Sequence, residues 1–379
     1  MMNSLFLPRV SVGTDAYDAF ADILPSAGTT CAIYYGEQAW KAAGGKVLSA
    51  MSRTGIRILE QQCYGKEASF ENAQRIIDSS SAASADFLLA VGGGKCMDTV
   101  KYAGFVMHKP VFTCPTIASN CAPVTRIAIM YTQQGAFREI VQLSEPPRHC
   151  FIDLQVAAEA PDCYLWAGMG DTMAKHVEAS FSARGDELTY GPRLGIKVSE
   201  LCYEDILQYG ARALADANRK QTSFALEIVV QNIIVTTGLV SVSVGADYNS
   251  ALAHALYYGL SVRRDVAEHH LHGEIVSYGT LVQLMMDAQT KMFEEVYAFN
   301  RSIGLPLKLA DLGLDVNSDL SDVLEVTANN QELIHVPYPV TKEKILQAMK
   351  RVEQYRLDDG DLVELRCFCR KETVRVCCE

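Results

Sequence analysis

The pattern of apolar and polar positions divides the chain into two parts. In the first part, short apolar runs of strand length alternate with segments of helical spacing. The predicted strands are residues 31–35, 55–59, 87–91, 110–115 and 149–152. This alternation predicts an α/β fold with a parallel sheet that is covered by helices on both faces.

Local signals add detail to this first part. Ser69 stands directly before a helical segment, and its hydroxyl makes it a predicted N-cap. Residues 126–131 and 137–141 are strand-like runs on either side of a turn at 133–135, which indicates a β-hairpin.

After Asp153 the apolar positions follow helical spacing almost without interruption. The longest predicted helices are residues 164–183, 194–215, 224–244 and 272–286. No strand-like alternation competes with this pattern. We therefore predict two domains, an α/β domain over residues 1–153 and an all-α domain over residues 154–379.

Three glycines, Gly92, Gly93 and Gly94, separate the apolar run 87–91 from the helical segment that follows. Glycines let the backbone approach a ligand closely and adopt positive φ angles. The N-terminus of the helix directs its free N–H groups and the positive end of its dipole to the same point, where a diphosphate is well placed. The sequence matches neither a Walker A loop nor the usual dinucleotide fingerprint. A plain strand-to-helix turn therefore stays open as the alternative.

Glu37 follows the strand at 31–35 after a single glycine. An acidic side chain at the end of an early strand commonly holds a ribose 2′-hydroxyl. Glu37 is therefore a candidate for favouring NAD over NADP, because it would repel a 2′-phosphate. The alternative is a solvated surface glutamate.

The composition of the 379 residues, 49% hydrophobic and 21% charged, is that of a folded chain long enough for two cores. The formal net charge of -11 argues against nucleic acid and anionic membranes as partners, because both select for clustered Lys and Arg. No apolar run approaches the roughly 20 residues that span a bilayer, and the first residues lack the features of a signal peptide. We expect a cytoplasmic homo-oligomer with a small-molecule substrate.

Most of the twelve cysteines stand singly in apolar segments, where a reduced thiol behaves as a small core side chain. The tail differs, because Cys367, Cys369, Cys377 and Cys378 are close together. Four such thiols can bind zinc or serve a redox role, although their spacing matches no common zinc module. Incidental thiols in a terminal segment are the alternative.

Three polar residues stand out in the apolar helical part. Asp171 follows two glycines, His254 lies among small residues, and His272 opens the segment His272-Gly273-Glu274. Taken singly, a helix cap, a core histidine and a surface histidine explain them. Taken together, one carboxylate and two imidazoles are three ligands for a divalent metal that keeps a fourth position open for catalysis.

Five motifs follow one another in a fixed order: Gly92-Gly93-Gly94-Lys95 with Asp98-Thr99, Pro115 to Ser119, Gly168 to Asp171, Ala253-His254 and His272-Gly273-Glu274. In this order and over nearly the whole chain they resemble the glycerol dehydrogenase branch of the iron-containing (metal-dependent) alcohol dehydrogenase family. The resemblance implies an N-terminal Rossmann-like domain, a C-terminal helical domain, and a cleft that holds NAD(P) and a metal.

The resemblance also assigns roles to residues. It places Asp171, His254 and His272 on the catalytic metal ligands. It places an acidic residue at the adenosine ribose, which supports Glu37 and favours NAD over NADP. The further cofactor contacts that it implies are Gly93, Gly94, Lys95, Asp98, Thr116, Ser119, Thr125, Ile127 and Tyr131.

Two departures from the family pattern matter. Iron-using members carry a histidine four residues after the ligand aspartate, where this chain has Lys175, so the site resembles the zinc type more than the Fe²⁺ type. Cys121 stands where glycerol dehydrogenases have an aspartate that binds substrate hydroxyls. A thiol is a weak acceptor, and its lack of charge favours a substrate with its own carboxylate. Arg126 and Arg263 are candidates to pair with that carboxylate.

These features imply a metal-dependent, NAD(P)-linked dehydrogenase that interconverts a small 2-hydroxy acid or polyol and its oxo form, similar to hydroxycarboxylate dehydrogenases. Glycerol dehydrogenase proper is the first alternative. The second is a lyase or cyclase resembling dehydroquinate synthase, which uses NAD only transiently. A non-catalytic protein on the same fold is disfavoured because all three ligand residues are present. His270, two residues before a ligand, is a candidate for the proton relay.

Overall fold

The computed structural model describes residue 6 and residues 8–356. The chain forms two compact units. The first unit comprises the described residues up to Ala160 together with Asp216–Val242, and the second comprises Pro161–Ala215 and the described residues from Ser243 to Arg356. The four tail cysteines at 367, 369, 377 and 378 lie outside the described residues.

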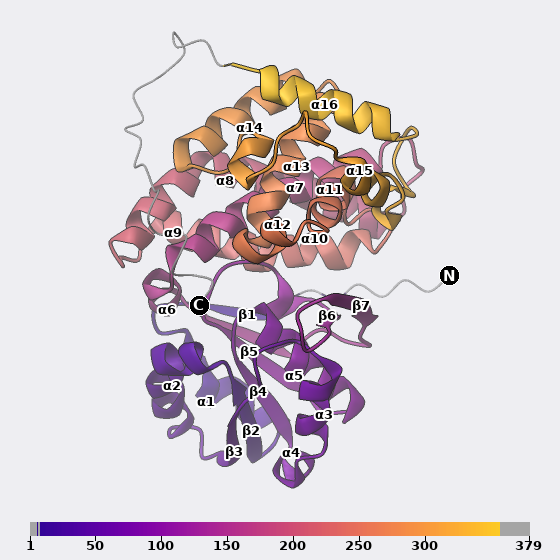
Figure 1. The fold of residues 1–379 in the computed structure, drawn as a ribbon. Coiled ribbons are helices and arrows are strands. Elements are labelled where there is room, and N and C mark those ends of the chain that lie inside the picture. Colours follow the sequence, from indigo (N-terminus) through magenta and orange to yellow (C-terminus); the bar gives the residue numbers. More distant parts are fainter. Residues whose placement is uncertain (1–5, 7, 357–379) are drawn as a thin grey trace. The chain divides into compact units, whose positions relative to one another are not determined.

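A six-stranded sheet forms the centre of the first unit (Figure 1). Its strands lie in the order β1-β8-β5-β4-β2-β3, and every neighbouring pair is parallel. Their bounds are β1 Val10–Gly13, β2 Thr30–Tyr35, β3 Arg57–Cys63, β4 Phe87–Gly92, β5 Val111–Pro115 and β8 His149–Asp153. A separate antiparallel hairpin joins β6 (Ile127–Tyr131) to β7 (Phe137–Gln142).

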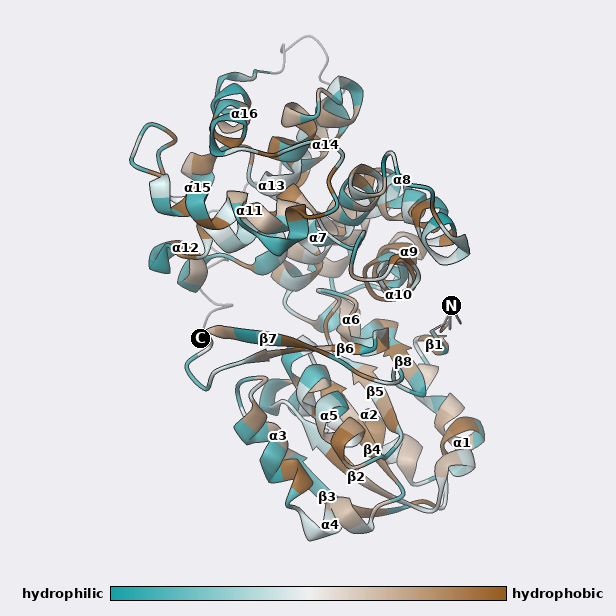
Figure 2. Ribbon diagram, turned by 90° about the vertical axis from the view of Figure 1, so that its right-hand side faces the viewer, coloured by the Kyte–Doolittle hydropathy of each residue, from teal (hydrophilic) through white to brown (hydrophobic). Residues whose placement is uncertain are grey.

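Alternate residues of the strands enter two cores, one on each face of the sheet. Cys31 and Ile33 pack on one face with residues of α1 and α2, whereas Ala32 and Tyr34 pack on the other with residues of α3, α4 and α5. In Figure 2 the central strands β4 and β5 are brown, as expected for strands that are buried on both faces. The helices of this layer are α1 Phe20–Ile23, α2 Glu37–Met51, α3 Phe70–Ile77, α4 Ser80–Ser84, α5 Gly94–Val106 and α6 Leu154–Glu159, with 3₁₀ turns at Ala16–Ala19, Leu24–Ala27 and Ala122–Val124.

The predicted α/β class with its parallel sheet is confirmed. The five predicted strands and the hairpin occur within a few residues of their expected bounds, and Ser69 caps α3 by accepting a hydrogen bond from the amide N–H of Asn72. The edge strand β1 was not predicted, because its four residues alternate valine with serine and glycine and so give no apolar run. It pairs with β8.

The described residues of the second unit form helices joined by turns and loops, with no strand. Its helices are α7 Asp162–Ser182, most of α8 (Tyr190–Asn218), α11 Leu252–Leu260, α12 Arg264–His269, α13 His272–Met286, α14 Thr290–Ile303, α15 Ser321–Ala328 and α16 Lys342–Gln354, with 3₁₀ turns at Leu309–Leu312 and Gln331–Leu333. The predicted helical remainder is thus confirmed, and α13 has the predicted bounds.

The division into compact units differs from the domain boundary predicted at Asp153. Residues 216–242 belong with the sheet, since α9 (Phe224–Gln231) contacts α6 and a Cβ at Gly238 would meet Val124. Helical spacing does not reveal which unit a helix joins. Whether the two predicted domains fold separately stays a prediction.

The segment Phe224–Val244 corrects the expectation that no apolar run is long enough to cross a bilayer. It runs through α9, a π-helical turn at Asn232–Thr236 and α10 (Thr237–Val244), and it is long and apolar enough to cross a membrane by length and composition. A core helix of a soluble protein can have the same length and composition, and about half of this segment is buried. The helix at 224–244 is itself predicted from the sequence. Gln231 and Asn232 divide its apolar positions into two shorter runs, so no single run reaches about 20 residues.

Candidate metal centre and nucleotide turn

Three side chains from three helices of the second unit converge on one point. Asp171 lies in the middle of α7, His254 in the first turn of α11, and His272 is the first residue of α13. Nε2 of each histidine lies 3.4 Å from Oδ1 of Asp171, and the three candidate ligand atoms all lie within 4.8 Å of one another. The structure thus brings together all three residues that the sequence singled out as ligands.

Close helix packing produces this convergence. A Cβ at Gly170 of α7 would lie 2.5 Å from the carbonyl oxygen of Gly273, and a Cβ at Gly273 of α13 would overlap the carbonyl of Ala167. Gly279 allows the same close approach between α13 and the backbone of Ala253 in α11. Only glycine fits where backbones approach so closely. These contacts fix the separation of the helices that carry the three candidate ligands.

The site is buried on one side and open on the other. The side chains of Asp171 and His254 are 10% and 12% exposed, whereas that of His272 is 41% exposed and packs edge-on against the ring of Tyr257. A site that is open beside His272 leaves room for an exchangeable ligand. One carboxylate oxygen and two imidazole nitrogens, with an open side, fit a catalytic divalent metal.

Burial and charge act in opposite directions on the titration of these groups. Burial by itself would raise the pKa of Asp171, but hydrogen bonds from His254 and His272 outweigh it and hold the pKa well below the usual range. Burial would lower the pKa of His254, but the carboxylates of Glu178 and Asp171 outweigh it and raise the pKa to about 10. The centre therefore carries an ionised carboxylate, and His254 must lose a proton before its Nε2 can bind a metal.

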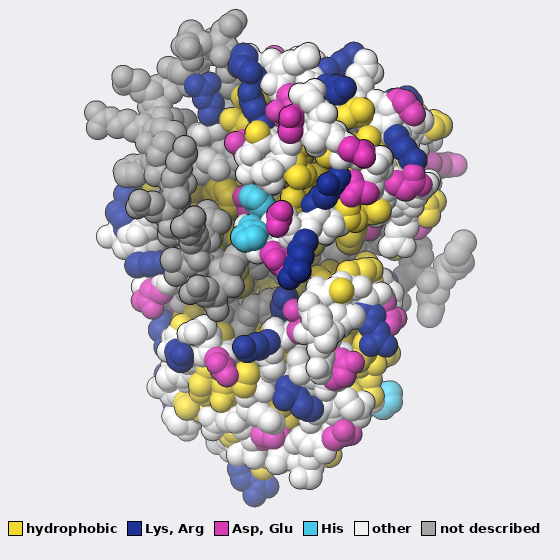
Figure 3. Space-filling model, viewed as in Figure 1, with side chains coloured by type: hydrophobic (Ala, Val, Ile, Leu, Met, Phe, Trp, Pro, Cys, Tyr) yellow, Lys and Arg dark blue, Asp and Glu magenta, His cyan; other side chains and the backbone are white. Residues whose placement is uncertain are grey.

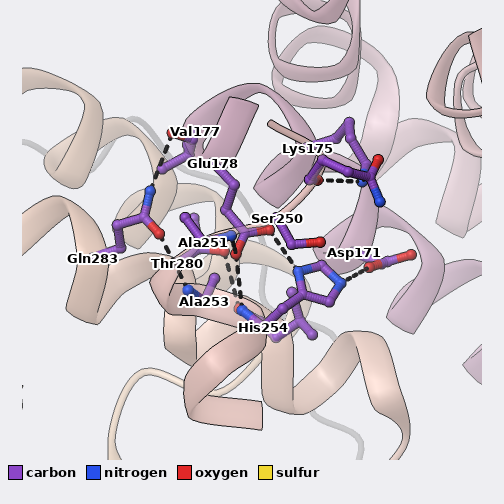
Figure 4. A network of polar contacts seen from close by, with 12 residues as sticks. Asp171, Lys175, Val177, Glu178, Ser250, Ala251, Ala253, His254, Thr280 and Gln283 are labelled. Atoms are coloured by element: carbon purple, nitrogen blue, oxygen red, sulfur yellow. Dashed lines mark hydrogen bonds and ion pairs between the residues drawn. The ribbon is translucent and has the colours of Figure 1, made fainter. Parts of the chain in front are cut away.

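Glu178, two turns after Asp171 on α7, contacts the far side of His254 (Figure 4). Its Oε2 lies 2.5 Å from Nδ1 of the His254 ring. Its Oε1 accepts hydrogen bonds from the backbone N–H groups of Ala251 and His254 at 2.8 and 2.9 Å. Figure 4 shows the imidazole between the two carboxylates, with one ring nitrogen directed at each.

Lys175 lies on the same face of α7 as Asp171 and Glu178 but points to a different group. Its ammonium donates hydrogen bonds to the backbone carbonyl and to Oδ1 of Asn249, at 2.8 and 3.1 Å. An ammonium has no lone pair for a metal. Iron-using enzymes are expected to carry a further histidine at this position. Here Lys175 instead holds the loop that contains Asn249.

The candidate nucleotide residues lie in the first unit, at the carboxyl ends of adjacent strands. Strands β2 and β4 are neighbours, and the chain continues from them in opposite directions across the sheet. Such a switch point is where open α/β sheets bind ligands. Glu37 follows β2 after a single glycine, and Gly93 follows β4 directly. Thr116 follows β5, which is the other neighbour of β4. The sheet therefore brings three of the predicted cofactor positions to one edge.

The glycines of the turn serve close packing rather than unusual backbone angles. Gly93 has a φ of -90°, and none of the three glycines has a positive φ, which corrects that part of the sequence-based interpretation. A Cβ at Gly93 would lie 2.8 Å from Ile117, and one at Gly94 would lie 2.9 Å from the Asn120 amide. The N-terminus of α5 follows at once, with no side-chain cap on its first N–H groups.

The other candidate cofactor positions surround this turn. Lys95 is paired with Glu67 at 2.7 Å and lies 5.8 Å from the centre of the Tyr131 ring, so these side chains form one group beside the turn. Ser119 is partly exposed, and Thr125 is buried. Whether each of them contacts a cofactor stays a prediction.

Asp98 faces the protein interior. Its carboxylate pairs with the Lys101 ammonium at 2.8 Å and accepts a hydrogen bond from the N–H of Ile129. The same ammonium donates to the backbone carbonyls of Ala122 and Ile127. This pair holds the segment that carries the candidate positions Thr125 and Ile127, so the geometry gives Asp98 a supporting role; direct contact with the cofactor stays a prediction.

The candidate residues for substrate binding and proton transfer differ in exposure and in the partners that they already have. Cys121 is partly exposed in the first unit, beside the 3₁₀ turn Ala122–Val124. Arg263 is already bound, since it donates to the carboxylate of Asp322 and the carbonyl of Asp319. Arg126 is partly buried, and its guanidinium lies 6.0 Å from the centre of the Phe6 ring. His270 is hydrogen-bonded to Glu274 at 2.8 Å. Arg263 is therefore the weaker of the two candidates for binding a substrate carboxylate.

Sequence reasoning missed three residues that support these sites: Glu178, Gln283 and Lys101. Glu178 stands seven residues after Asp171, which places both on one helix face, and that spacing was a usable signal. Lys101 stands three residues after Asp98, a spacing at which opposite charges pair on a helix. Gln283 has no local signal, because its partners lie on α7 and α11.

Known proteins resemble this chain in both sequence and fold. Residues 8–154 match the family model described as iron-containing alcohol dehydrogenase. A glycerol dehydrogenase from Thermotoga maritima is 36% identical over 312 residues, which cover 80% of this chain and 84% of that protein. Hydroxycarboxylate dehydrogenase A from Escherichia coli K12 is 29% identical over 326 residues, covering 85% and 89%. The crystal structure of a probable glycerol dehydrogenase from Sinorhizobium meliloti superimposes with a TM-score of 0.79 at 25% identity, covering 93% of this chain and 98% of that one.

Proposed function

Since the chain belongs to the iron-containing alcohol dehydrogenase family, in its glycerol dehydrogenase branch, we propose that it interconverts a small 2-hydroxy acid and the corresponding 2-oxo acid with NAD and zinc. Membership of this family makes the protein a metal-dependent oxidoreductase that acts on the CH–OH group of small hydroxy compounds. The substrate, the metal and the choice of nicotinamide cofactor are the parts that we add.

The observation that carries the proposal is the convergence of Asp171, His254 and His272. When bound there, a divalent metal lowers the pKa of a substrate hydroxyl and polarises a carbonyl. The protein contributes the negative charge of Asp171, which is held ionised by its hydrogen bonds. The half-exposed side of the site at His272 gives a small substrate access, while buried His254 and Glu178 keep the opposite side closed to water.

Two features of the chain favour zinc over iron. The ligand set of one carboxylate and two imidazoles leaves a fourth position open, as in catalytic zinc sites. Lys175 stands where a further histidine ligand would be needed for the iron type, and its ammonium is hydrogen-bonded to Asn249. We therefore assign Zn²⁺ as the working metal.

The nucleotide turn supports NAD as the cofactor. The uncapped N-terminus of α5 offers N–H groups to a diphosphate, and the glycines keep side chains out of its way. Glu37 is exposed in the first turn of α2, at the end of β2, where an acidic group favours a free ribose hydroxyl and disfavours a 2′-phosphate. We therefore propose that NAD is preferred and NADP is the weaker cofactor.

Cys121 supports a substrate that carries a carboxylate. The aspartate expected at this position would bind vicinal hydroxyls and repel an anion, whereas a thiol does neither. One of the similar proteins is a hydroxycarboxylate dehydrogenase, and its name is consistent with this choice. Arg126 is the candidate partner for the substrate carboxylate, because Arg263 is already paired.

A substrate panel tests the proposal. The zinc-reconstituted enzyme is assayed with 2-oxobutyrate, 2-oxoglutarate and glycerol, with NAD and NADP forms of the cofactor, by following NAD(P)H absorbance. We expect the 2-oxo acids to react faster than glycerol, and Cys121→Asp to reverse that order. Faster glycerol oxidation by the wild type would instead support the glycerol dehydrogenase alternative, for which the Thermotoga maritima protein is the precedent. Product formation without net NAD(P)H turnover would support the lyase alternative.

Mixed surface charge fits a small-molecule enzyme of the cytoplasm, which is the compartment that we propose. Figure 3 shows Lys and Arg side chains interspersed with Asp and Glu on the face that it presents, without a continuous basic patch. The net charge of -11 points the same way. We also propose a homo-oligomer without nucleic acid or membrane partners, and light scattering coupled to gel filtration measures its mass.

A further inference from the structure

The first turn of α11 carries His254. No side chain of this turn accepts a hydrogen bond from its free backbone N–H groups. The N-cap residue Ala251 has no polar side chain, so the backbone donors need partners from elsewhere. Glu178 accepts from the N–H groups of Ala251 and His254 through a single oxygen, Oε1. Gln283 of α13 accepts from the N–H of Ala253 at 3.1 Å. Two neighbouring helices thus cap α11 with buried side chains.

These capping helices are the two that carry the other metal ligands. Glu178 shares α7 with Asp171, and Gln283 shares α13 with His272. Gln283 also donates from its amide to the carbonyl of Val177, which links α13 to α7 directly. Figure 4 shows dashed contacts from both side chains to the first turn of α11, from Glu178 to His254 and from Gln283 to Ala253. The cap therefore positions His254 relative to both of the other ligands.

The two oxygens of Glu178 have different partners. Oε1 faces two backbone donors, whereas Oε2 faces Nδ1 of His254 at 2.5 Å. An ionised carboxylate only accepts hydrogen bonds, so Nδ1 must carry the proton that it shares with Oε2. A neutral imidazole with its proton on Nδ1 has its free lone pair on Nε2, the nitrogen that points toward Asp171.

We propose that Glu178 is a positioning residue of the metal centre, which fixes both the place and the tautomer of His254, and that the first turn of α11 enforces this role. This inference rests on the proposed metal centre. It extends to residues that make no contact with substrate or cofactor. It also explains why a fully buried carboxylate is retained beside the site.

The substitution Glu178→Gln keeps the cap of α11 but changes which nitrogen of His254 carries the proton. The backbone N–H groups of Ala251 and His254 need an acceptor, so the amide oxygen of the introduced side chain must take the place of Oε1. The amide NH₂ then faces Nδ1 of His254 and donates to it. Nδ1 becomes an acceptor, and the ring proton moves to Nε2, where it blocks the metal. Rotating the amide would place NH₂ against two backbone donors, so the amide cannot restore the original pattern.

Gln283→Met is the matched control. It removes the acceptor for Ala253 and the link to Val177 while keeping a side chain of similar length. It leaves Glu178 and Nδ1 of His254 untouched. We expect Gln283→Met to lower the melting temperature of the metal-free protein and to weaken zinc binding less than tenfold. We expect Glu178→Gln to show the reverse pattern, with a small change in melting temperature and about 100-fold weaker zinc binding.

Zinc affinity is measured by competition with a chromophoric chelator at one pH, and folding by circular dichroism of the metal-free proteins. Equal zinc affinity of Glu178→Gln and the wild type would overturn the inference. The inference would also be overturned if the loss of zinc affinity in the two variants simply followed the decrease in their melting temperatures. A wild type that binds no zinc would instead remove the metal centre itself, which keeps the two failures apart.

A second measurement needs no variant of Glu178, in case Glu178→Gln does not fold. Nitrogen-15 spectra of histidine-labelled, zinc-loaded wild type report which ring nitrogen of His254 keeps its proton, with His254→Asn for assignment. We expect a protonated Nδ1 and a metal-bound Nε2. The opposite arrangement would overturn the proposed role of Glu178.

Discussion

The metal centre and the nucleotide turn are built in opposite ways. The nucleotide turn is local, since one strand, three glycines and one helix follow one another within residues 87–106. The metal centre is assembled from three helices whose ligands lie up to about a hundred residues apart in sequence, and close backbone contacts set its geometry. The first region depends on the order of elements along the chain, whereas the second depends on packing. We therefore expect the metal centre to be sensitive to substitutions that change helix packing, and the nucleotide turn to be sensitive to substitutions within its own short segment.

The largest effect is expected from removing a ligand. Asp171→Ala takes away the only anionic ligand, so zinc content should fall and kcat/KM should drop by at least about 10³-fold, because the metal contributes several kcal/mol to catalysis. Metal analysis and steady-state kinetics measure both. The exposed Asp247 of the same unit is the control, and Asp247→Ala should leave both unchanged. Full activity of Asp171→Ala would refute the metal centre.

The nucleotide region also depends on a buried ion pair, Asp98 with Lys101, whose ammonium binds backbone carbonyls of the segment 122–127. Lys101→Met leaves the Asp98 carboxylate buried without its partner and should destabilise the protein by about 3–5 kcal/mol. Chemical denaturation measures this free energy. Lys197→Met, which alters an exposed cation, should leave the unfolding midpoint unchanged. A small loss for Lys101→Met would show that the segment at 122–127 is held by other contacts.

The dependence of the metal centre on helix packing can be tested with two glycines. Gly273→Ala adds a Cβ that overlaps the carbonyl of Ala167, so α7 and α13 must separate, and we expect a loss of about 1–3 kcal/mol together with weaker zinc binding. Gly45→Ala in α2 meets nothing within 4 Å and should stabilise the protein by about 0.5–1 kcal/mol. Thermal unfolding measures both. If the two variants behave alike, close approach is not what shapes the centre.

Proton competition should make zinc binding depend on pH. The carboxylates raise the pKa of His254 in the metal-free protein to about 10, so zinc must displace a proton throughout the range below it. Apparent zinc affinity should rise by up to about tenfold per pH unit between pH 6.5 and 8.5. The stability that this proton gives to the metal-free fold is complete below about pH 6.5 and is lost as the pH rises toward 10. A flat affinity profile would contradict the raised pKa.

The smallest effect is expected in the nucleotide region, at the exposed Glu37. Glu37→Ser removes one charge at the end of β2, so the ratio of kcat/KM for NADP over that for NAD should rise about tenfold. Glu71→Ser, on the exposed side of α3, is the control and should leave the ratio unchanged. An unchanged ratio for Glu37→Ser would remove this residue from the cofactor site.

The contrast also explains what the sequence could predict. Strand-like runs, the Ser69 cap and the glycine turn are local patterns, and the structure has them close to the predicted positions. The three candidate metal ligands were grouped by residue type, as one carboxylate and two imidazoles, and by the family resemblance, because no local pattern places them close together. The contact of Gly273 with Ala167 joins helices about a hundred residues apart, and no local periodicity encodes it.

Two further features have no signal in the sequence. The edge strand β1 is short and alternates valine with serine and glycine, so it gives no apolar run. Residues 216–242 have the same helical spacing as the second unit, so their packing with the sheet does not show in the pattern. The absence of positive φ angles in the glycine turn was also unforeseen, because the need there is for space beside Ile117 and Asn120.

The most direct test of the central claim is an anomalous difference map from crystals of the zinc-loaded protein. The account predicts one strong peak about 2.0–2.2 Å from a carboxylate oxygen of Asp171 and from Nε2 of both His254 and His272. A peak bonded to other residues, or to Nδ1 of His254, would contradict it.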